Sequence, residues 1–349
     1  MIYRSNTSAD DFHTDTRGFF AARRVLVLGG SGFIGSHVVE QLLSLKAEPV
    51  VVNRSQQAPF LAHLPEVERH VFSLEDRQNL RSLMAGCSVV IHSAAQIAGL
   101  EHNAAHPASM FMNNMKLAFA PMETAAEVGI ERYLVTSSAC VYPRDCSIPT
   151  PEEEGFLDSP EPTNDGYGWS KRMQEFLGQA AAREYGLSVA IARPYNAYGP
   201  RDNFDPASSH VLAALIRKAV LADDGSFPVW GDGSHSRSFL YVDDFARGML
   251  EVAARYPEAD AVNIGADEET TIREAAELVG ALVSKRLGRT VVPQFDPAGL
   301  TGQPRRRCDT GKAERLLQYR AKVPLTTGLE RTIDWYLEHR DSALPTHTL

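Results

Sequence analysis

The sequence is poor in cysteine, which limits the roles that thiols can have in it. Its 349 residues include only four cysteines, Cys87, Cys140, Cys146 and Cys308, and none forms a Cys-x-x-Cys pair. No cluster of histidine and cysteine has the spacing of a zinc site, so we expect no metal. Cys140 lies within the run "SSACVYP" at Ser137–Pro143, and its thiol therefore needs another explanation.

Long apolar runs and an excess of basic charge are also absent. No stretch approaches the roughly 20 apolar residues that a membrane-spanning helix needs. Residues 1–22 are polar and lack the apolar core of a signal peptide, so we expect a cytoplasmic protein with no membrane partner. The formal net charge of −9 at pH 7 gives no support to a nucleic-acid partner.

Apolar runs typical of buried strands alternate with helical stretches in the first half of the chain. The runs are Val25–Leu28, "EPVVVNRS", Ser88–Ala95 and Arg132–Ser138, and the clearest helical stretch is Met110–Val128. Strands that alternate with helices form a parallel sheet covered on both faces, and right-handed crossovers wind it in both directions. The sequence therefore predicts an α/β fold with a doubly wound parallel Rossmann sheet and a smaller α/β substrate-binding part.

The composition changes after Pro194, where Pro, Gly and Asp become frequent and the predicted strands become shorter. We expect residues 1–22 to be a loosely held polar extension. The dinucleotide-binding part should comprise residues 23–193 plus about 235–265. The nucleotide-sugar part should comprise about 194–234 plus 266–345, so that the chain passes between the two parts more than once.

A glycine pattern follows the first predicted strand directly. Gly29, Gly32 and Gly35 have the spacing GxxGxxG and open a helix. Such a turn lets the backbone approach a pyrophosphate, and the helix N-terminus stabilises the negative charge. We predict a dinucleotide site here, against the alternative of a glycine-rich turn without a ligand. The other candidate contacts of the cofactor are Ser31, Phe33, Ile34, Ala94 and Ala95.

The second predicted strand ends in Asn53 and Arg54, where an NAD-specific site usually has an acidic residue for the ribose 2′-hydroxyl. Asn53 does not repel a 2′-phosphate, and Arg54 can pair with one through two parallel hydrogen bonds. The sequence therefore favours NADP(H), with NAD(H) as the alternative.

Tyr167 and Lys171 in "YGWSK" are four residues apart and share one face of a helix. An ammonium near a phenol should lower the pKa of the tyrosine and make it a usable proton donor and acceptor. Ser138, at the end of a predicted strand, can hydrogen-bond the same substrate oxygen.

With these motifs in order, the chain resembles the extended short-chain dehydrogenase/reductase family from about residue 23 to residue 340. "RPYNAYGP", "RSFLYVDD" and "VNIG" extend the likeness. The resemblance implies a nicotinamide cofactor, catalysis by Ser138, Tyr167 and Lys171, and nucleotide-activated sugars as substrates. It also implies a homodimer that forms through helices at about 104–128 and 167–185.

Cys140 distinguishes between the subfamilies. The 4,6-dehydratases carry an Asp-Glu pair where this chain has Ala139 and Cys140. "SSACVYP" is similar to GDP-L-fucose synthases and GDP-mannose 3,5-epimerases, in which this cysteine is half of an acid/base pair beside a C4 ketone. The resemblance places the other half at His210. The alternatives are a small buried side chain for Cys140 and a helix-capping or surface role for His210.

The resemblance also supplies candidate contacts for a nucleotide-sugar substrate, with a GDP-linked sugar favoured. Fixed positive charge suits a pyrophosphate. These candidates are Asn196, Val229, Trp230, Arg237 and Arg306.

We therefore predict an NAD(P)-dependent enzyme that epimerises carbons flanking a C4 ketone and then reduces that ketone with NADPH. The first alternative is a 3,5-epimerase with tightly bound NAD and no net redox change. The second is a non-catalytic dinucleotide sensor on the same fold.

Overall fold

The computed structural model describes residues 3–55, 57–298 and 302–340. Within these residues, the centre of the molecule is a seven-stranded sheet in which all the paired strands are parallel. The strands in spatial order are β11 (Glu258–Ile264), β6 (Val189–Pro194), β5 (Arg132–Thr136), β4 (Val89–His92), β1 (Arg24–Leu28), β2 (Glu48–Asn53) and β3 (Glu68–Val71). The predicted doubly wound fold is confirmed.

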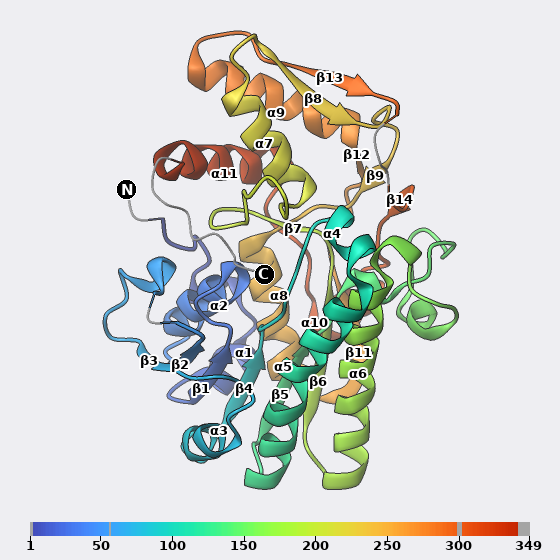
Figure 1. Cartoon of the computed structure of the whole chain (residues 1–349). Helices are drawn as coiled ribbons and strands as arrows, with labels where there is room; N and C mark the ends of the chain where they lie inside the picture. Colours follow the sequence, from blue (N-terminus) through green and yellow to red (C-terminus); the bar gives the residue numbers. More distant parts are fainter. Residues whose placement is uncertain (1–2, 56, 299–301, 341–349) are drawn as a thin grey trace.

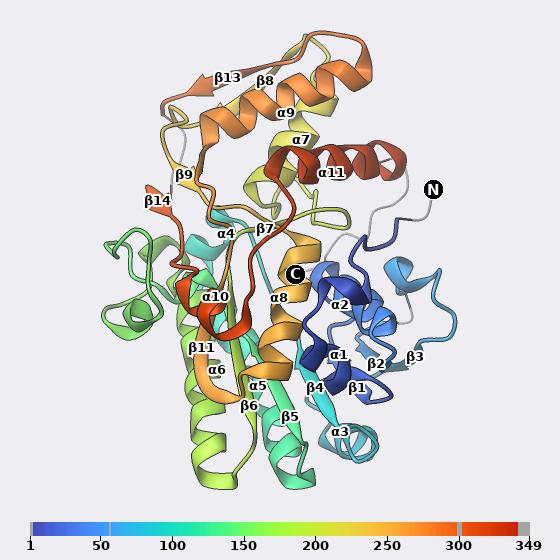
Figure 2. The same ribbon diagram turned by 180° about the vertical axis from the view of Figure 1, so that it is seen from behind.

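Helices cover both faces of this sheet, because its central strands carry apolar side chains on both faces and each face must be shielded from water. One face carries α3 (Arg77–Met84), α5 (Pro107–Val128) and α6 (Asp165–Tyr185). The other carries α1 (Thr14–Phe20), α2 (Phe33–Ser44), α8 (Val242–Arg255) and α10 (Gly311–Leu317), as seen from behind in Figure 2.

A smaller assembly lies above the carboxyl ends of the strands (Figure 1). Its helices are α4 (Leu100–Ala105), α7 (Val211–Leu221), α9 (Ile272–Leu287) and α11 (Leu325–His339). Its strands are β7 (Ala197–Tyr198), β8 (Ser226–Trp230), β9 (Ser236–Arg237), β10 (Leu240–Tyr241), β12 (Thr270–Thr271), β13 (Val292–Asp296) and β14 (Arg305–Arg306). Short 3-10 turns at Ala9–Asp11, Pro59–Leu61, Ala139–Val141, Glu152–Phe156 and Pro162–Asn164 complete the connections.

Two details of local structure differ from the expectations. The run "RSFLYV" forms two short strands, β9 and β10, because Ser238 bonds through its N–H to Arg306 while Leu240 bonds to Asn196. The expectation of a loosely held N-terminal extension is wrong for residues 3–22. Phe20 of α1 is fully buried, and Thr16 donates to the buried Glu251 of α8 at 2.6 Å.

The division into a dinucleotide-binding and a nucleotide-sugar part stays a prediction. Residues 1–2 and 341–345 of the predicted parts lie outside the described residues. Across the described ranges, no helix is both long and apolar enough to cross a membrane.

Candidate active site

The turn between β1 and α2 requires glycine at two positions. Gly29 has a φ of +80°, and a Cβ there would lie 2.8 Å from the backbone of Ala94. A Cβ on Gly35 would lie 2.1 Å from the carbonyl oxygen of Gly29. The helix that follows begins at Phe33 and has no side-chain cap, so no capping side chain occupies its first N–H groups. This arrangement suits the binding of an anion.

The end of β2 offers a second feature suited to a dinucleotide. Asn53 is buried there, and its Oδ1 has no hydrogen-bond partner among the described residues. Arg54 follows it and is exposed, so its guanidinium is free to reach a ribose phosphate. A nicotinamide dinucleotide therefore fits these residues: the glycine turn would hold its pyrophosphate, and Asn53 would contact a ribose. When bound, such a cofactor supplies or accepts a hydride.

A pocket of about 480 Å³ opens beside this turn, between the large sheet and the smaller assembly. It brings together most of the residues that the sequence singles out: Phe33, Ile34, Ala95, Ser138, Cys140, Tyr167, Lys171, Asn196, His210, Val229, Trp230, Arg237 and Arg306. The remaining predicted residues are not among those that line the pocket. They lie in the glycine turn and after β2 and β4: Gly29, Ser31, Gly32, Gly35, Asn53, Arg54 and Ala94.

Tyr167 and Lys171 extend from the first two turns of α6 toward Ser138, which precedes the turn Ala139–Val141. The Lys171 Nζ lies 5.6 Å from the centre of the Tyr167 ring and donates to the Thr136 carbonyl at 2.8 Å. Burial lowers the pKa of Lys171 to about 8.

The pKa of Tyr167 departs from the expectation. Burial raises it, the nearby charge of Cys140 adds to the rise, and a hydrogen bond from Ser138 opposes it. The expected lowering by Lys171 is therefore wrong for this arrangement. The ammonium is directed to the Thr136 carbonyl rather than to the phenol, and desolvation of the phenolate dominates.

Cys140 is half-buried among polar partners and not in a purely apolar environment. Its Sγ accepts a hydrogen bond from Nδ2 of Asn164 at 2.7 Å and lies 3.8 Å from Nη1 of Arg306. The sequence analysis missed Asn164 as a contact of the thiol, although it stands three residues before Tyr167. The thiol therefore lines the pocket with an amide donor and a guanidinium beside it.

His210 stands immediately before α7, and 45% of its side chain is exposed. Its Nδ1 lies 3.7 Å from Oδ1 of the buried Asp202. Desolvation disfavours the imidazolium, but the nearby Asp202 carboxylate outweighs it, so the pKa of His210 is raised. The side chain makes no capping hydrogen bond to α7, and it lines the pocket instead.

Two arginines place positive charge on the substrate side of the pocket. Burial and the charge of Arg306 together lower the pKa of Arg237 to about 9, and Glu161 partly offsets them. Two half-buried guanidiniums that repel one another favour an anionic ligand such as a diphosphate.

The other predicted substrate residues also line the pocket. Trp230 exposes 53% of its surface, and the Lys218 ammonium lies 5.0 Å from its ring centre. Asn196 donates to the Ser238 carbonyl at 2.7 Å, while Val229 is mostly buried in the core below the pocket.

The four cysteines are free thiols. Among the described residues, no group of three or more His, Cys, Asp or Glu side chains is placed to hold a metal ion.

Comparisons with known proteins identify relatives of this chain. The chain is 33% identical over 324 residues to a probable GDP-L-fucose synthase 1 from Oryza sativa subsp. japonica, which covers 92% of this chain and 94% of the relative. It is 31% identical to a dTDP-4-dehydro-6-deoxy-D-allose reductase from Streptomyces bikiniensis, with 92% and 98% covered. The structure of a dTDP-glucose 4,6-dehydratase from Streptomyces venezuelae, with NAD and TYD bound, superposes with a TM-score of 0.76. That protein is 30% identical, and the match covers 91% of this chain and 98% of the other.

The family model "NAD dependent epimerase/dehydratase family" matches residues 25–265, which is more than half of the chain. The resemblance to the extended short-chain dehydrogenases is thereby confirmed. The chain belongs to the NAD-dependent epimerase/dehydratase family and is an NAD(P)-dependent nucleotide-sugar enzyme.

Proposed function

We propose that the protein epimerises carbons that flank a C4 ketone in a nucleotide sugar and then reduces the ketone with NADPH. The observation that carries this proposal is that Cys140 and His210 line the same pocket as Ser138, Tyr167 and Lys171. Inversion of a carbon needs one group that removes a proton and another that returns one from the opposite face. A simple C4 epimerase or a sensor needs no such second pair.

The surroundings of the pocket side chains support a separate role for each of them. A C–H bond next to a ketone is weakened because the charge moves onto the C4 oxygen. Tyr167, whose pKa is raised, remains protonated and can donate a hydrogen bond to that oxygen together with Ser138. Cys140, next to Asn164 and Arg306, is suited to take the proton, and His210 to return one from its imidazolium form.

In the reduction, the hydride comes from the nicotinamide cofactor. Tyr167 delivers its phenolic proton to the C4 oxygen and is left as a phenolate. The Lys171 ammonium, 5.6 Å from the centre of the Tyr167 ring, balances this negative charge. The exposed Arg54 after Asn53 supports NADP(H) over NAD(H). The likeness to a GDP-L-fucose synthase supports a GDP-linked sugar.

A second candidate is reduction of a dTDP-linked 4-keto-6-deoxy sugar without inversion. The 31% identity to an enzyme named as such a reductase favours it. A third is the 3,5-epimerase with retained NAD, for which the reaction has no net redox change.

We propose that the protein forms a homodimer through α5 and α6. These helices pack on each other and expose large apolar side chains at Met112, Phe119, Trp169, Phe176 and Tyr185. Sedimentation of the parent protein and of Phe176→Glu tests this assembly, and a monomeric parent would contradict it.

The decisive experiment incubates the protein with GDP-, dTDP- and UDP-linked 4-keto-6-deoxy sugars in heavy water, with and without NADPH. Deuterium uptake beside the ketone reports epimerisation, and loss of NADPH absorbance reports reduction. Deuterium uptake together with NADPH oxidation supports the proposal, and NADPH oxidation without deuterium uptake supports the reductase without inversion. If no nucleotide sugar is turned over, the proposal fails and the non-catalytic dinucleotide sensor is favoured instead.

A further inference from the structure

Arg201 lies in the loop between β7 and α7, nine residues before His210, and its conformation is unusual. Its φ is +71°, a left-handed backbone value that residues other than glycine rarely adopt. Such a residue keeps this conformation only where surrounding contacts hold it. Only 2% of Arg201 is exposed, so those contacts must come from the protein.

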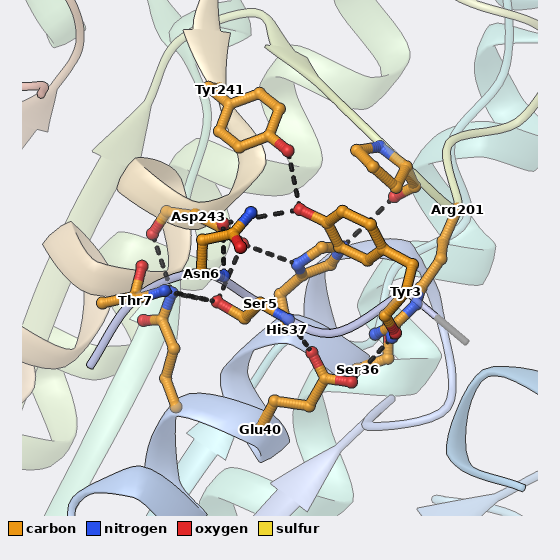
Figure 3. Close-up of polar contacts among 12 residues, drawn as sticks. Tyr3, Ser5, Asn6, Thr7, Ser36, His37, Glu40, Arg201, Tyr241 and Asp243 are labelled. Atoms are coloured by element: carbon orange, nitrogen blue, oxygen red, sulfur yellow. Dashed lines mark hydrogen bonds and ion pairs between the residues drawn. The ribbon is translucent and has the colours of Figure 1, made fainter. Parts of the chain in front are cut away.

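The contacts of Arg201 come from two segments that are distant in the sequence. Its Nη2 donates to the carbonyl oxygen of Tyr3 at 2.7 Å and to Oε1 of Glu40 at 2.6 Å. Its Nη1 donates to Oγ of Ser36 at 3.2 Å. Glu40 and Ser36 belong to α2, the helix that opens at the glycine turn, and Tyr3 belongs to the N-terminal segment (Figure 3).

The residue before Arg201 is anchored in the same way. The fully buried His37 of α2 lies 3.1 Å from the Pro200 carbonyl through Nε2 and 2.9 Å from Asp243 through Nδ1. A carbonyl can only accept, and the pKa of Asp243 is held low because its contacts with His37 and with residues 5–6 outweigh its burial. The ring of His37 therefore links the Pro200 carbonyl to the Asp243 carboxylate.

The N-terminal segment adds further hydrogen bonds to the network around Arg201 and His37. Ser5 donates through Oγ to Asp243 at 2.9 Å, and the backbone N–H of Asn6 donates to the same carboxylate at 3.0 Å. The hydroxyl groups of Tyr3 and Tyr241 lie 2.6 Å apart. The backbone N–H of Ser5 donates to Glu40 at 2.7 Å, so the segment bonds to both helices at once (Figure 3).

Further along the chain, the loop that holds Arg201 leads to His210, one member of the proposed proton-transfer pair. Asp202 follows Arg201 and is buried, and its Oδ1 lies 3.7 Å from Nδ1 of His210, which is an ion-pair distance. A shift of Arg201 would therefore displace the carboxylate that lies at ion-pair distance from the imidazole. The matched family region begins at residue 25, so the segment that contributes Tyr3 and Ser5 lies outside it.

We propose that residues 3–7 and Arg201 form a brace that positions Asp202 and His210 in the pocket and ties them to the cofactor helix α2. In this brace Arg201 is a positioning residue and touches no substrate. The assignment rests on the proposed role of His210 as an acid/base group. It adds a determinant of inversion that lies in the N-terminal segment, outside the matched family region.

The test compares the parent with a deletion of residues 1–7 and with Arg201→Gln. The matched control is Lys322→Ala, which breaks an ion pair of 2.8 Å to Asp11 in the same N-terminal region but does not touch the loop. The readouts are the pKa of His210 by NMR of labelled histidine, deuterium uptake beside the ketone, and the dissociation constant of NADPH.

We expect both test variants to lower the pKa of His210 toward its ordinary value and to slow deuterium uptake by roughly tenfold to a hundredfold, the scale of a misplaced catalytic group. The affinity for NADPH should change by less than about twofold, and Arg201→Lys, which keeps a charge for Glu40, should recover part of the uptake. The control should behave as the parent.

An unchanged pKa of His210 with unchanged uptake in the folded variants would overturn the brace. Loss of folding in both test variants would assign these contacts to general stability and overturn it as well. If the pKa of His210 shifts as expected but the parent itself takes up no deuterium, the brace stands and the proposed function fails.

Discussion

The buried ammonium of Lys171 predicts an unusual dependence of stability on pH. Burial lowers its pKa to about 8 in the folded protein, against an ordinary value of 10.5. Between these two values the unfolded chain binds more protons than the folded one, so the free energy of unfolding rises with pH. Below pH 8 the charged amine opposes folding, and this penalty is relieved as the pH approaches 10.5.

The size of the effect follows from the difference of about 2.5 pKa units, which corresponds to about 3 kcal/mol. Lys171→Met removes this penalty. It also leaves the carbonyl oxygen of Thr136 without its donor, which costs about 1–3 kcal/mol at every pH. The two changes nearly cancel at pH 7, whereas only the second remains near pH 10.

Urea unfolding at pH 7 and pH 10 measures the prediction. The parent should gain about 2–3 kcal/mol over Lys171→Met between these pH values, because other titrating groups cancel in the comparison. Lys285→Met, at an exposed lysine of α9, is the matched control and should give no such gain. Parallel pH profiles for the parent and Lys171→Met would refute the account of this lysine.

Further predictions concern the remaining site residues. Tyr167→Phe should abolish NADPH oxidation while nucleotide affinity, measured by calorimetry, stays near the parent value; equal turnover would remove the phenol from the mechanism. Cys140→Ser should slow deuterium uptake by roughly 10²-fold or more, while direct C4 reduction survives. Uptake at the parent rate would make this thiol a packing residue. Arg54→Ala should weaken NADPH binding by roughly 1.5–3 kcal/mol and leave NADH binding nearly unchanged. Tighter binding of NADH than NADPH by the parent would contradict this.

The sequence predicted the central sheet well because parallel strands that are buried on both faces appear as continuous apolar runs. The runs at Val25–Leu28 and Arg132–Ser138 fall on β1 and β5 within a few residues. The glycine turn was equally visible, because the backbone at Gly29 and the close approach at Gly35 leave no room for another side chain.

What the sequence hid depends on contacts between residues far apart in the chain. The polar character of residues 3–7 suggested a loose extension, yet their partners lie 35 to 240 residues away, which no local pattern reveals. The proximity of Asn164 and Arg306 to the thiol of Cys140 is likewise set by the fold. The pKa of Tyr167 was predicted wrongly because spacing along a helix indicates a neighbour but not the extent of desolvation.

The position of β11 has a consequence for how the chain acquires its structure during synthesis. Strand β6 is buried along its whole length, but its outer partner, β11, follows only after residues 195–257, which form much of the smaller assembly. A nascent chain that has not yet reached residue 258 therefore presents β6 as an apolar sheet edge with unpaired N–H and C=O groups. Such an edge is a template for pairing with other chains. Fragments that end between residues 195 and 257 should consequently aggregate, whereas addition of Glu258–Ile264 closes the edge.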